Sequence, residues 1–562
     1  MSWRKLIVTA GLTVLITALP GCRNKFDLMD RYLQEAHRLW GFNGVVAVTQ
    51  RGDLLLAKGY GMADTAFGNP NTLTTKFFIG SITKQFTAAA ILLLHERGHL
   101  QLTDPITRYL PDYPADPGDR ITIHQLLTHT SGLPNYTDFP SIVLGRTIEV
   151  QPWDIVATFK SRPLDFEPGT GFHYSNSGYL LLGLIIEAVS GQSYEAFLHK
   201  EIFKPLGMLN SGYGRRVMGH PNRAEGYTID AEGRLIGAVP ISFSIMFSAG
   251  ALYTTVEDML KWESALLNGT LLSPYSVALM MTPYSDGYGY GWWLDDRYGR
   301  SHAFHDGFLD GFNCTYDRWL EDDLAVIVFS NDDEAPVRKI ADGLAAIVFG
   351  KRPVIPVRKE AVAVEADRLR RFVGRYLTAS GNERTVYLDN GRLYTFIGGG
   401  RPFALLPESE RKFFFEKDNT ETLTFESSDK GRIDAVIYSN GENRWRLERV
   451  NQPGATEDRT DGSDVQLSTE QLRALVGEYR LEAEAGHPSG AFAITVAICD
   501  AHLCAVVGDN HPVLLLARSD TLFYHPSSDF RMQFHTAPDG RLSSCTITMG
   551  DATVEAVRGV GQ

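Results

Sequence analysis

Long runs of basic residues are absent from this sequence, although it contains 54 lysines and arginines. Aspartate and glutamate outnumber them at 67, which leaves a formal net charge of −13. Affinity for nucleic acid comes largely from cationic contacts to phosphate, so nucleic acid is not an expected partner. The apolar fraction of 44% and the charged fraction of 22% are those of an ordinary globular protein.

Cysteine is scarce, with five among 562 residues. Beyond residue 22 the cysteines are Cys314, Cys499, Cys504 and Cys545. Cys499 and Cys504 flank a predicted hairpin turn and could form a disulfide in an exported protein, but Cys545 is an equally suitable partner. Their spacing around a lone histidine is poor for zinc. No metal is therefore assigned, and no cofactor is expected.

Apolar runs long enough to suggest a membrane span are also lacking, and the N-terminus carries only a short one. Arg4 and Lys5 precede the apolar residues 6–19, a stretch too short for a transmembrane helix but typical of an export signal. Cys22 follows a small residue and resembles the lipidation site of a bacterial lipoprotein. Because Pro20 is unusual in that position, ordinary cleavage and a retained anchor remain alternatives. We predict a lipoprotein-type signal over residues 1–22 and a periplasmic or cell-envelope location.

The chain is too long for one hydrophobic core and predicts roughly three domains. Residues 23–350 alternate helical and strand patterns. Two β-rich runs lie within residues 44–57 around a turn at 51–53, and a further strand at 322–331 precedes a helical pattern at 337–349. Strands at both ends with helices between them predict an α+β domain whose sheet is assembled from both termini.

Ser81 and Lys84 lie in the stretch that we expect to organise this domain. A helical pattern runs from Gly80 to about Arg97, stops at Gly98, and is apolar almost all round, which predicts a buried helix. A lysine in such a helix needs a partner, and residues three apart share a face. A desolvated amine beside a serine activates a weak nucleophile. The alternative is that Ser81 caps the helix and Lys84 extends outward.

Two further polar clusters follow. Tyr174 and Asn176 lie in a glycine- and serine-rich loop before the apolar run 180–186, and the alternative is a turn with a packed aromatic ring. His305 and Gly307 lie within residues 301–313, where an edge strand with glycine would let a substrate approach. The alternative for His305 is a structural histidine.

The order Ser81-x-x-Lys84, Tyr174-x-Asn176 and His305-x-Gly307 resembles the serine penicillin-recognising hydrolases. The tyrosine is the pattern of the class C β-lactamase branch, which includes D-aminopeptidases and esterases. Residues 126–134, 248–259 and 288–292 also resemble that branch, and the resemblance covers residues 30 to 350. It implies a β-lactamase/transpeptidase-like fold, an antiparallel sheet flanked by helices, and it explains His124 and His129 structurally.

The resemblance implies a role for each matching position. Ser81 would form an acyl-enzyme, Lys84 and Tyr174 would share the general-base work, and Asn176 would orient a substrate amide. The backbone N–H groups of Ser81 and Phe308 would form the oxyanion hole. His305 and Gly307 replace a Lys-Thr-Gly element. A histidine is largely neutral at pH 7, so substrates with a carboxylate become less favoured.

After residue 350 the composition changes. A charged, proline-containing linker over 351–367 precedes two similar segments, 368–450 and 467–562, separated by a linker over 451–466. Leu369–Tyr376 matches Leu472–Tyr479, and both copies show short alternating strands with Asn-Gly or Asp-Gly turns. These features predict two small antiparallel, lipocalin-like β-barrels. We expect the barrels to contribute stability or to act as spacers. The alternative is that a loop of the second barrel, residues 524–530 with Asp529, covers the active-site cleft and limits substrate size.

The combined prediction is an exported serine hydrolase that acts through Ser81 on small peptides or amides such as those with D-amino acids. An esterase or weak β-lactamase or DD-peptidase on the same machinery is the first alternative. A non-catalytic binder of cell-wall fragments or β-lactams is the second. The expected partner is a small molecule or short peptide, with membrane contact only through the anchor or a retained signal. The motifs do not predict an oligomeric state.

Overall fold

The computed structural model describes residues 20–559 with internal gaps. Outside the description are residues 1–19, 140–141, 143–148, 221, 230–234, 239–240, 355–358, 379–382, 390, 398–402, 416–419, 429–431, 441–443, 451–466, 482–492, 500–501, 508–512, 525–530, 538–540, 550–551 and 560–562. Most of the predicted export signal, the linker 451–466 and the loop with Asp529 therefore lie outside the described residues. No helix in the described part is long and apolar enough to cross a membrane.

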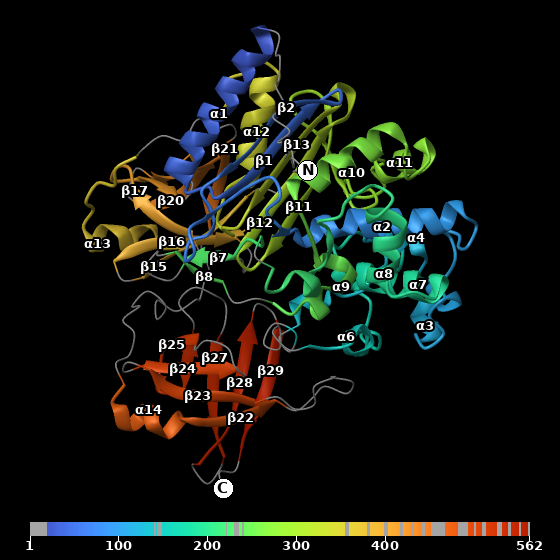
Figure 1. Ribbon diagram of the computed structural model, residues 1–562. Coiled ribbons are helices and arrows are strands. Elements are labelled where there is room, and N and C mark those ends of the chain that lie inside the picture. Colours follow the sequence, from blue (N-terminus) through green and yellow to red (C-terminus); the bar gives the residue numbers. More distant parts are fainter. Residues whose placement is uncertain are drawn as a thin grey trace, which may run out of the picture.

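One antiparallel sheet joins the two ends of the first domain (Figure 1). Its strand order is β10-β11-β12-β13-β1-β2, so the N-terminal hairpin pairs with the last strand of the domain. The strands are β1 (Gly44–Gln50), β2 (Asp53–Tyr60), β10 (Trp293–Asp296), β11 (Ser301–Leu309), β12 (Phe312–Trp319) and β13 (Leu324–Ser330). The turn between β1 and β2 has positive φ at Arg51 and Gly52. The prediction of a sheet built from both termini is confirmed.

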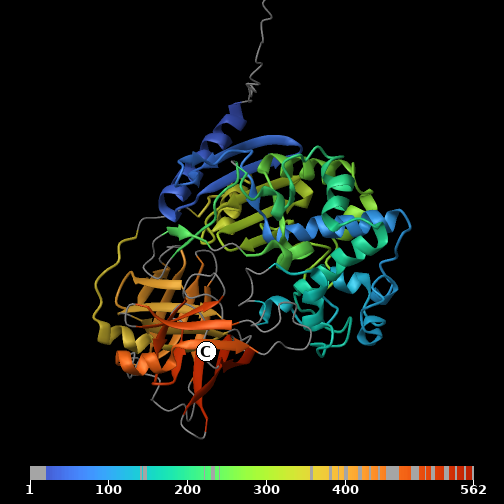
Figure 2. The same cartoon turned by 60° about the horizontal axis from the view of Figure 1, so that its bottom comes forward.

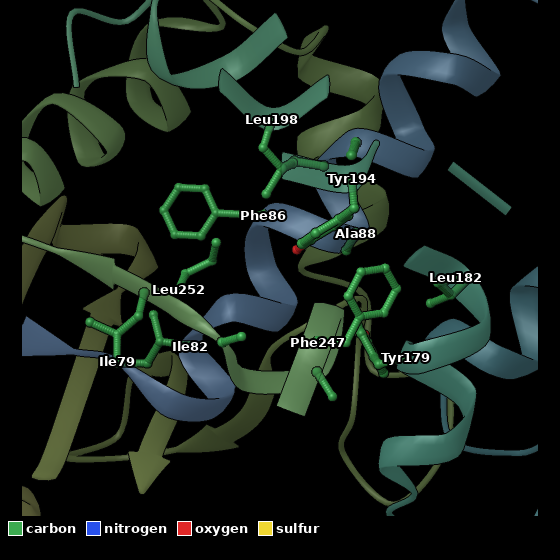
Figure 3. Close-up of a cluster of buried hydrophobic side chains, with 14 of the residues drawn as sticks. Ile79, Ile82, Phe86, Ala88, Tyr179, Leu182, Tyr194, Leu198, Phe247 and Leu252 are labelled. Atoms are coloured by element: carbon green, nitrogen blue, oxygen red, sulfur yellow. The ribbon is translucent and has the colours of Figure 1, made fainter. Parts of the chain in front are cut away.

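Helices cover both faces of this sheet. On one face α1 (Pro20–Trp40) packs beside α12 (Val337–Val348) around a buried apolar cluster. The other face carries α2 (Thr83–Glu96), which is buried along twelve successive residues as its apolar pattern predicts. Phe86 of α2 lies 4.6 Å from the ring of Trp262, and Figure 3 shows the surrounding buried side chains. The predicted α+β domain is confirmed.

The remaining elements of this domain include two longer helices, α7 and α10, and many short ones. The helices are α3 (Ala115–Gly118), α4 (Ile123–Leu127), α6 (Pro152–Phe159), α7 (Asn176–Ser190), α8 (Tyr194–Leu198), α9 (Phe243–Gly250), α10 (Val256–Asn268) and α11 (Pro274–Met280). The tighter or wider turns are η1 (Gly80–Ile82), η2 (Ile106–Arg108), η3 (Tyr136–Asp138), η4 (His199–Phe203), η5 (Gly214–Val217) and η6 (Leu320–Asp322). The small strands are β3 (Met62–Asp64), β4 (Asn69–Pro70), β5 (Phe77–Phe78), β6 (Gly212–Tyr213), β7 (Tyr227–Ile229), β8 (Leu235–Gly237) and β9 (Leu252–Thr254).

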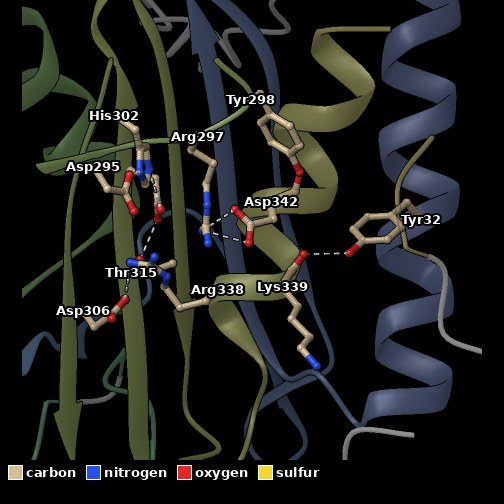
Figure 4. A network of polar contacts seen from close by, with 11 residues as sticks. Tyr32, Asp295, Arg297, Tyr298, His302, Asp306, Thr315, Arg338, Lys339 and Asp342 are labelled. Carbon is tan, nitrogen blue, oxygen red and sulfur yellow. Dashed lines mark hydrogen bonds and ion pairs between the residues drawn. The ribbon is translucent and has the colours of Figure 1, made fainter. Parts of the chain in front are cut away.

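A polar network around the buried side chains of His302 and Asp317 fixes α12 against the sheet (Figure 4). His302 of β11 lies between Asp295 and Asp317, at 2.7 and 3.1 Å. Burial opposes the charged ring, but the hydrogen bonds to the two carboxylates raise the pKa of His302. Arg338 of α12 contacts Asp306 at 3.4 Å, and Asp306 lies on β11, the strand that also carries His302. The network therefore anchors β11, the strand that carries His305 and Gly307.

Two closed barrels of eight sequential strands follow, as predicted (Figures 1 and 2). The first contains α13 (Ala366–Leu369), η7 (Arg370–Phe372), β14 (Gly374–Leu377), β15 (Glu383–Asp389), β16 (Arg392–Ile397), β17 (Phe403–Pro407), β18 (Lys412–Phe415), β19 (Thr422–Ser427), β20 (Ile433–Ser439) and β21 (Arg444–Arg449). The second contains α14 (Thr469–Leu475), β22 (Gly477–Leu481), β23 (Ala493–Cys499), β24 (His502–Val507), β25 (Val513–Ala517), β26 (Leu522–Tyr524), β27 (Arg531–Thr536), β28 (Leu542–Met549) and β29 (Ala552–Arg558).

The barrels repeat one another in detail. The hydroxyl of Tyr376 donates to the Phe372 carbonyl at 2.7 Å, and that of Tyr479 donates to the Leu475 carbonyl at the same distance. The first barrel contacts the first domain through an ion pair of 3.0 Å between Lys339 of α12 and Glu421.

The cysteines resolve one alternative left by the sequence. Cys504 is disulfide-bonded, whereas Cys314 and Cys545 are free and buried. Cys545 is therefore not the partner of Cys504.

Candidate active site

Ser81 lies in the turn η1 that leads into α2. Gly80 precedes it with φ +47°, and a Cβ at that position would lie 2.6 Å from the backbone nitrogen of Phe308. A Cβ at Gly307 would lie 1.9 Å from the carbonyl oxygen of Ile79. These two glycines let β11 approach the turn closely enough to bring the backbone of Phe308 beside that of Ser81. Neither η1 nor α2 has a side-chain cap, so the alternative of Ser81 as a helix cap is wrong.

Lys84 is fully buried, and the alternative that it extends outward is also wrong. Its Nζ lies 2.9 Å from Ser81 Oγ, 2.8 Å from Asn176 Oδ1 and 2.8 Å from the carbonyl oxygen of Ala249. No carboxylate among the described residues pairs with it, and burial holds the pKa of Lys84 well below its ordinary value. A neutral amine has two N–H donors, which the oxygens of Asn176 and Ala249 accept. In that neutral form the lone pair of Lys84 Nζ points to Ser81 Oγ and can accept its hydroxyl proton, whereas a protonated Lys84 donates to Oγ.

The carbonyl of Ala249 is a contact that the sequence does not reveal by residue type. It comes from α9, which is interrupted at Phe247 with φ 34° and ψ −128°. That conformation is costly for a residue with a Cβ and persists only where the surroundings enforce it. The adjacent Ser248 carbonyl accepts a hydrogen bond of 2.7 Å from Thr87 of α2. The only sequence signal was the family-like stretch that contains these residues.

Tyr174 and Asn176 reach the same amine from the start of α7. Lys84 Nζ lies 4.9 Å from the centroid of the Tyr174 ring. The Tyr174 hydroxyl lies near Ser81, and burial raises the pKa of this phenol. Asn176 Nδ2 donates to Thr137 Oγ1 at 3.1 Å, which orients the amide so that its oxygen faces Lys84. Thr137 is a supporting residue that no motif indicated.

His305 is neutral in this arrangement. Its Nδ1 lies 2.7 Å from the carbonyl oxygen of Asp306 and therefore carries the proton, so Nε2 accepts from the Tyr288 hydroxyl at 2.9 Å. Burial lowers the pKa of His305 to about 3. The predicted edge position needs correction, because β10 lies outside β11. Its pairing ends at Phe304, so His305 and Gly307 lie beyond the covered part of the strand.

His129 packs behind Tyr174, consistent with its expected structural role. Its ring centroid lies 4.3 Å from that of Tyr174 and 4.5 Å from that of Tyr288. Its Nδ1 accepts the backbone N–H of Ser175 at 3.1 Å. Burial holds the pKa of His129 well below its ordinary value, so the ring is a neutral support for the loop that carries Tyr174.

The structure therefore brings the predicted residues of three distant segments together around Ser81. Within the described residues, no group of three or more histidine, cysteine, aspartate or glutamate side chains could hold a metal ion. The arrangement places a hydroxyl, an amine of lowered pKa, a phenol and an amide at one point, and these are the groups that nucleophilic acyl transfer requires.

Comparisons with known proteins agree with this geometry. The family model described as Beta-lactamase matches residues 30–349, and a model described as a domain of unknown function matches residues 358–451. Penicillin-binding protein 4* of Bacillus subtilis (strain 168) is 31% identical over 447 residues, covering 75% of this chain and 97% of that protein. The octameric penicillin-binding protein homologue from Pyrococcus abyssi aligns with TM-score 0.55 and 28% identity over 75% of this chain and 99% of its own. A D-stereospecific amidohydrolase from Streptomyces sp. aligns with TM-score 0.50 and 26% identity over 58% of this chain and 99% of its own.

Proposed function

This chain belongs to the Beta-lactamase family of serine hydrolases, and from that premise we propose that it hydrolyses small amides through an acyl-enzyme on Ser81. The observation that carries the proposal is the contact of 2.9 Å between Ser81 Oγ and the amine of Lys84. That amine is buried without a carboxylate partner among the described residues, and its pKa is lowered. A neutral lysine beside a serine is a general base next to a nucleophile.

Acylation follows from these contacts. Lys84 Nζ accepts the proton of Ser81 as Oγ forms a bond to the substrate carbonyl carbon, and the carbonyl oxygen becomes an oxyanion. The intermediate then collapses, and the bond to the leaving nitrogen breaks. The raised pKa of Tyr174 keeps its phenol protonated, so it can donate a proton to that nitrogen and regain one from the Lys84 ammonium. Water then hydrolyses the ester on Ser81 by the reverse transfers.

The oxyanion would be held by the backbone N–H groups of Ser81 and Phe308. Their proximity depends on the close approach of β11 to the turn at Gly80. Donors preorganised in this way supply several kcal/mol of transition-state stabilisation. The remaining N–H of Asn176 Nδ2 is available to a substrate carbonyl, which would place the scissile bond over Ser81.

We favour uncharged amides and short peptides, such as those with D-amino acids, as substrates. A permanent cation at position 305 would suit a substrate carboxylate, but His305 is neutral and engaged with Tyr288. The fold of a D-stereospecific amidohydrolase is compatible with this preference. Esterase or weak β-lactamase or DD-peptidase activity on the same machinery is the alternative. The assembled contacts of Ser81, Lys84 and Asn176 argue against a non-catalytic binder.

A substrate panel with variants at His305 tests this preference. With D-alanine amide, a short-chain nitrophenyl ester and a chromogenic cephalosporin, the wild type is expected to show the lowest kcat/KM for the cephalosporin. His305→Lys is expected to raise that value about tenfold, since one charge-assisted hydrogen bond to a carboxylate contributes about 1.5 kcal/mol. His305→Gln, which stays neutral, is the matched control and should give no such gain.

Two results would reject the preference. One is a wild-type enzyme that turns over the cephalosporin at least as well as the amide. The other is a cephalosporin gain in the glutamine variant equal to that in the lysine variant.

We further propose that the chain is exported and anchored through a lipid on Cys22. The support is the pattern of Arg4, Lys5 and the apolar residues 6–19. Intact mass of the protein from the membrane fraction of expressing bacteria should correspond to a chain that begins at Cys22 and carries acyl groups. A mass that includes Met1, or a Cys22→Ser variant with the same fractionation, would contradict lipid anchoring.

A further inference from the structure

Arg384 of the first barrel is a buried cation with almost no partner. It is the second residue of β15, points inward, and is only 4% exposed. A guanidinium has five N–H donors. In the described part of the chain, one hydrogen bond of 3.4 Å to Thr395 Oγ1 is the only one it makes. Burying a charge without pairing it costs several kcal/mol, and no carboxylate of the described residues forms an ion pair with this side chain.

Aromatic rings rather than carboxylates surround the guanidinium. Its carbon lies 4.4 Å from the ring centroid of Tyr438 and 5.5 Å from that of Phe415. Burial lowers the pKa of Arg384, and the charge of Glu421 opposes that shift. Glu421 is already paired with Lys339 at 3.0 Å. Cation–π contacts offset part of the desolvation cost but leave the donors unused.

The second barrel shows whether this fold needs an arginine at this position. Its strands pair in the same register as those of the first barrel, so equivalent interior residues can be compared. Arg384 is opposite Tyr376, and Ile494 is opposite the equivalent Tyr479. The strand pairings also make Ala505 of the second barrel equivalent to Thr395, and Ile547 equivalent to Tyr438. The three replacing residues, Ile494, Ala505 and Ile547, are at most 2% exposed. The same barrel thus closes with an apolar interior, and the fold itself does not require the arginine.

Exposed aromatic side chains lie at the same end of the first barrel. Phe403 is 43% exposed and Trp445 is 41% exposed. Phe403 lies 6.0 Å from Phe415, and Trp445 stacks on Tyr438 at 5.3 Å. Phe403 and Trp445 thus contact the two rings that surround Arg384, and they are themselves exposed to solvent. The guanidinium therefore lies beneath an accessible aromatic surface.

We propose that this end of the first barrel binds an amphipathic anion, a carboxylate carried on an apolar or aromatic body. The carboxylate would take two N–H donors of Arg384, a geometry that the guanidinium fork favours. The body would lie against Phe403 and Trp445. The site is separate from Ser81 and does not depend on the proposed hydrolysis.

Calorimetric titration of the full chain with 2-naphthoate tests the proposal, with 2-naphthylmethanol as the uncharged analogue. We expect one saturable naphthoate site and at least tenfold weaker binding of the alcohol. Arg384→Ile copies the residue of the second barrel and is expected to weaken naphthoate binding at least tenfold. Arg411→Ile removes an exposed arginine of the same barrel, whose Nη1 donates to Ser427 at 2.7 Å, and should leave the affinity unchanged.

Thermal unfolding gives an independent measurement. Arg384→Ile should fold with an unchanged or higher Tm, because an uncompensated buried charge is removed, and naphthoate should raise the Tm of the wild type but not of this variant. Trp445→Ala changes an exposed residue and should weaken naphthoate binding about fivefold or more. The proposal would be overturned if the wild type showed no saturable naphthoate binding or bound the alcohol equally well. It would also be overturned if either Arg384→Ile or Trp445→Ala kept the full affinity for naphthoate.

Discussion

Replacing Ser81 with alanine is expected to lower kcat on every accepted substrate by about four to six orders of magnitude. The variant removes the only atom to which the acyl group is transferred, and loss of the nucleophile in a serine hydrolase has effects of this size. Intact-mass measurement should show an acyl adduct on the wild type with slowly hydrolysed substrates and none on Ser81→Ala.

Ser301→Ala is a suitable control because this exposed serine begins the strand that carries His305, and its hydroxyl bonds only the carboxylate of Glu321 among the described residues. It should retain both turnover and the adduct. An adduct of unchanged mass and rate on Ser81→Ala would remove Ser81 from the mechanism.

Replacing Lys84 with methionine is expected to reduce acylation about a thousandfold, within the range known for a lost general base. Methionine has nearly the same length and no charge, so the buried volume is kept while the proton acceptor is lost. Asn176 and Ala249 each lose a hydrogen-bond donor, so a moderate loss of stability is expected as well. Stopped-flow acylation and thermal unfolding, measured on the same preparation, separate the two effects.

The direction in which kcat/KM changes with pH identifies the general base of acylation. Lys84 accepts a proton only when it is neutral, so kcat/KM should rise with pH through the pKa of Lys84 and then level off. Because burial lowers that pKa well below 10.5, the rise should be centred far below the pH at which an exposed lysine titrates. The rise should disappear in Lys84→Met. A rise that persists in the variant, or one centred near 10.5, would assign the base to another group.

Local signals in the sequence were sufficient for much of the fold. Alternating apolar runs around residues 51–53 predicted the β1–β2 hairpin, and the repeated segments after residue 367 predicted two barrels. The position of β10 outside β11 was not predicted, because β10 pairs through only four residues and its length leaves no periodic pattern. The pairing of β13 with β1 joins segments far apart in the chain, and the sequence predicted it from strand patterns at both ends of the domain, not from a local signal for that pairing.

At the site, the predicted side chains do meet, since Ser81, Lys84, Tyr174 and Asn176 are joined by direct contacts. Two groups at the site were not predicted, the backbone carbonyl of Ala249 and the side chain of Thr137, which lies outside the motifs. The carbonyl of Ala249 could not be singled out by residue type, because every residue carries a carbonyl, and only the family-like stretch 248–259 marked its neighbourhood. Arg384 escaped for a different reason: an arginine in an alternating strand is ordinarily exposed, and only the barrel interior reveals its burial.

The pairing of β1 with β13 has a consequence for the order in which the protein is made. Gly44 is aligned with Ser330, so the first strand leaves the ribosome long before the strand that completes its ladder. During synthesis β1 would expose an apolar edge, since six of its seven residues are buried in the finished sheet. Contacts at such long sequence separation slow folding and leave unfinished chains prone to association. The first domain can thus mature only after its whole length has been synthesised. In each barrel most strands pair with their neighbours in the chain, and the pairings that close the barrels, β14 with β21 and β22 with β29, span a much shorter part of the chain.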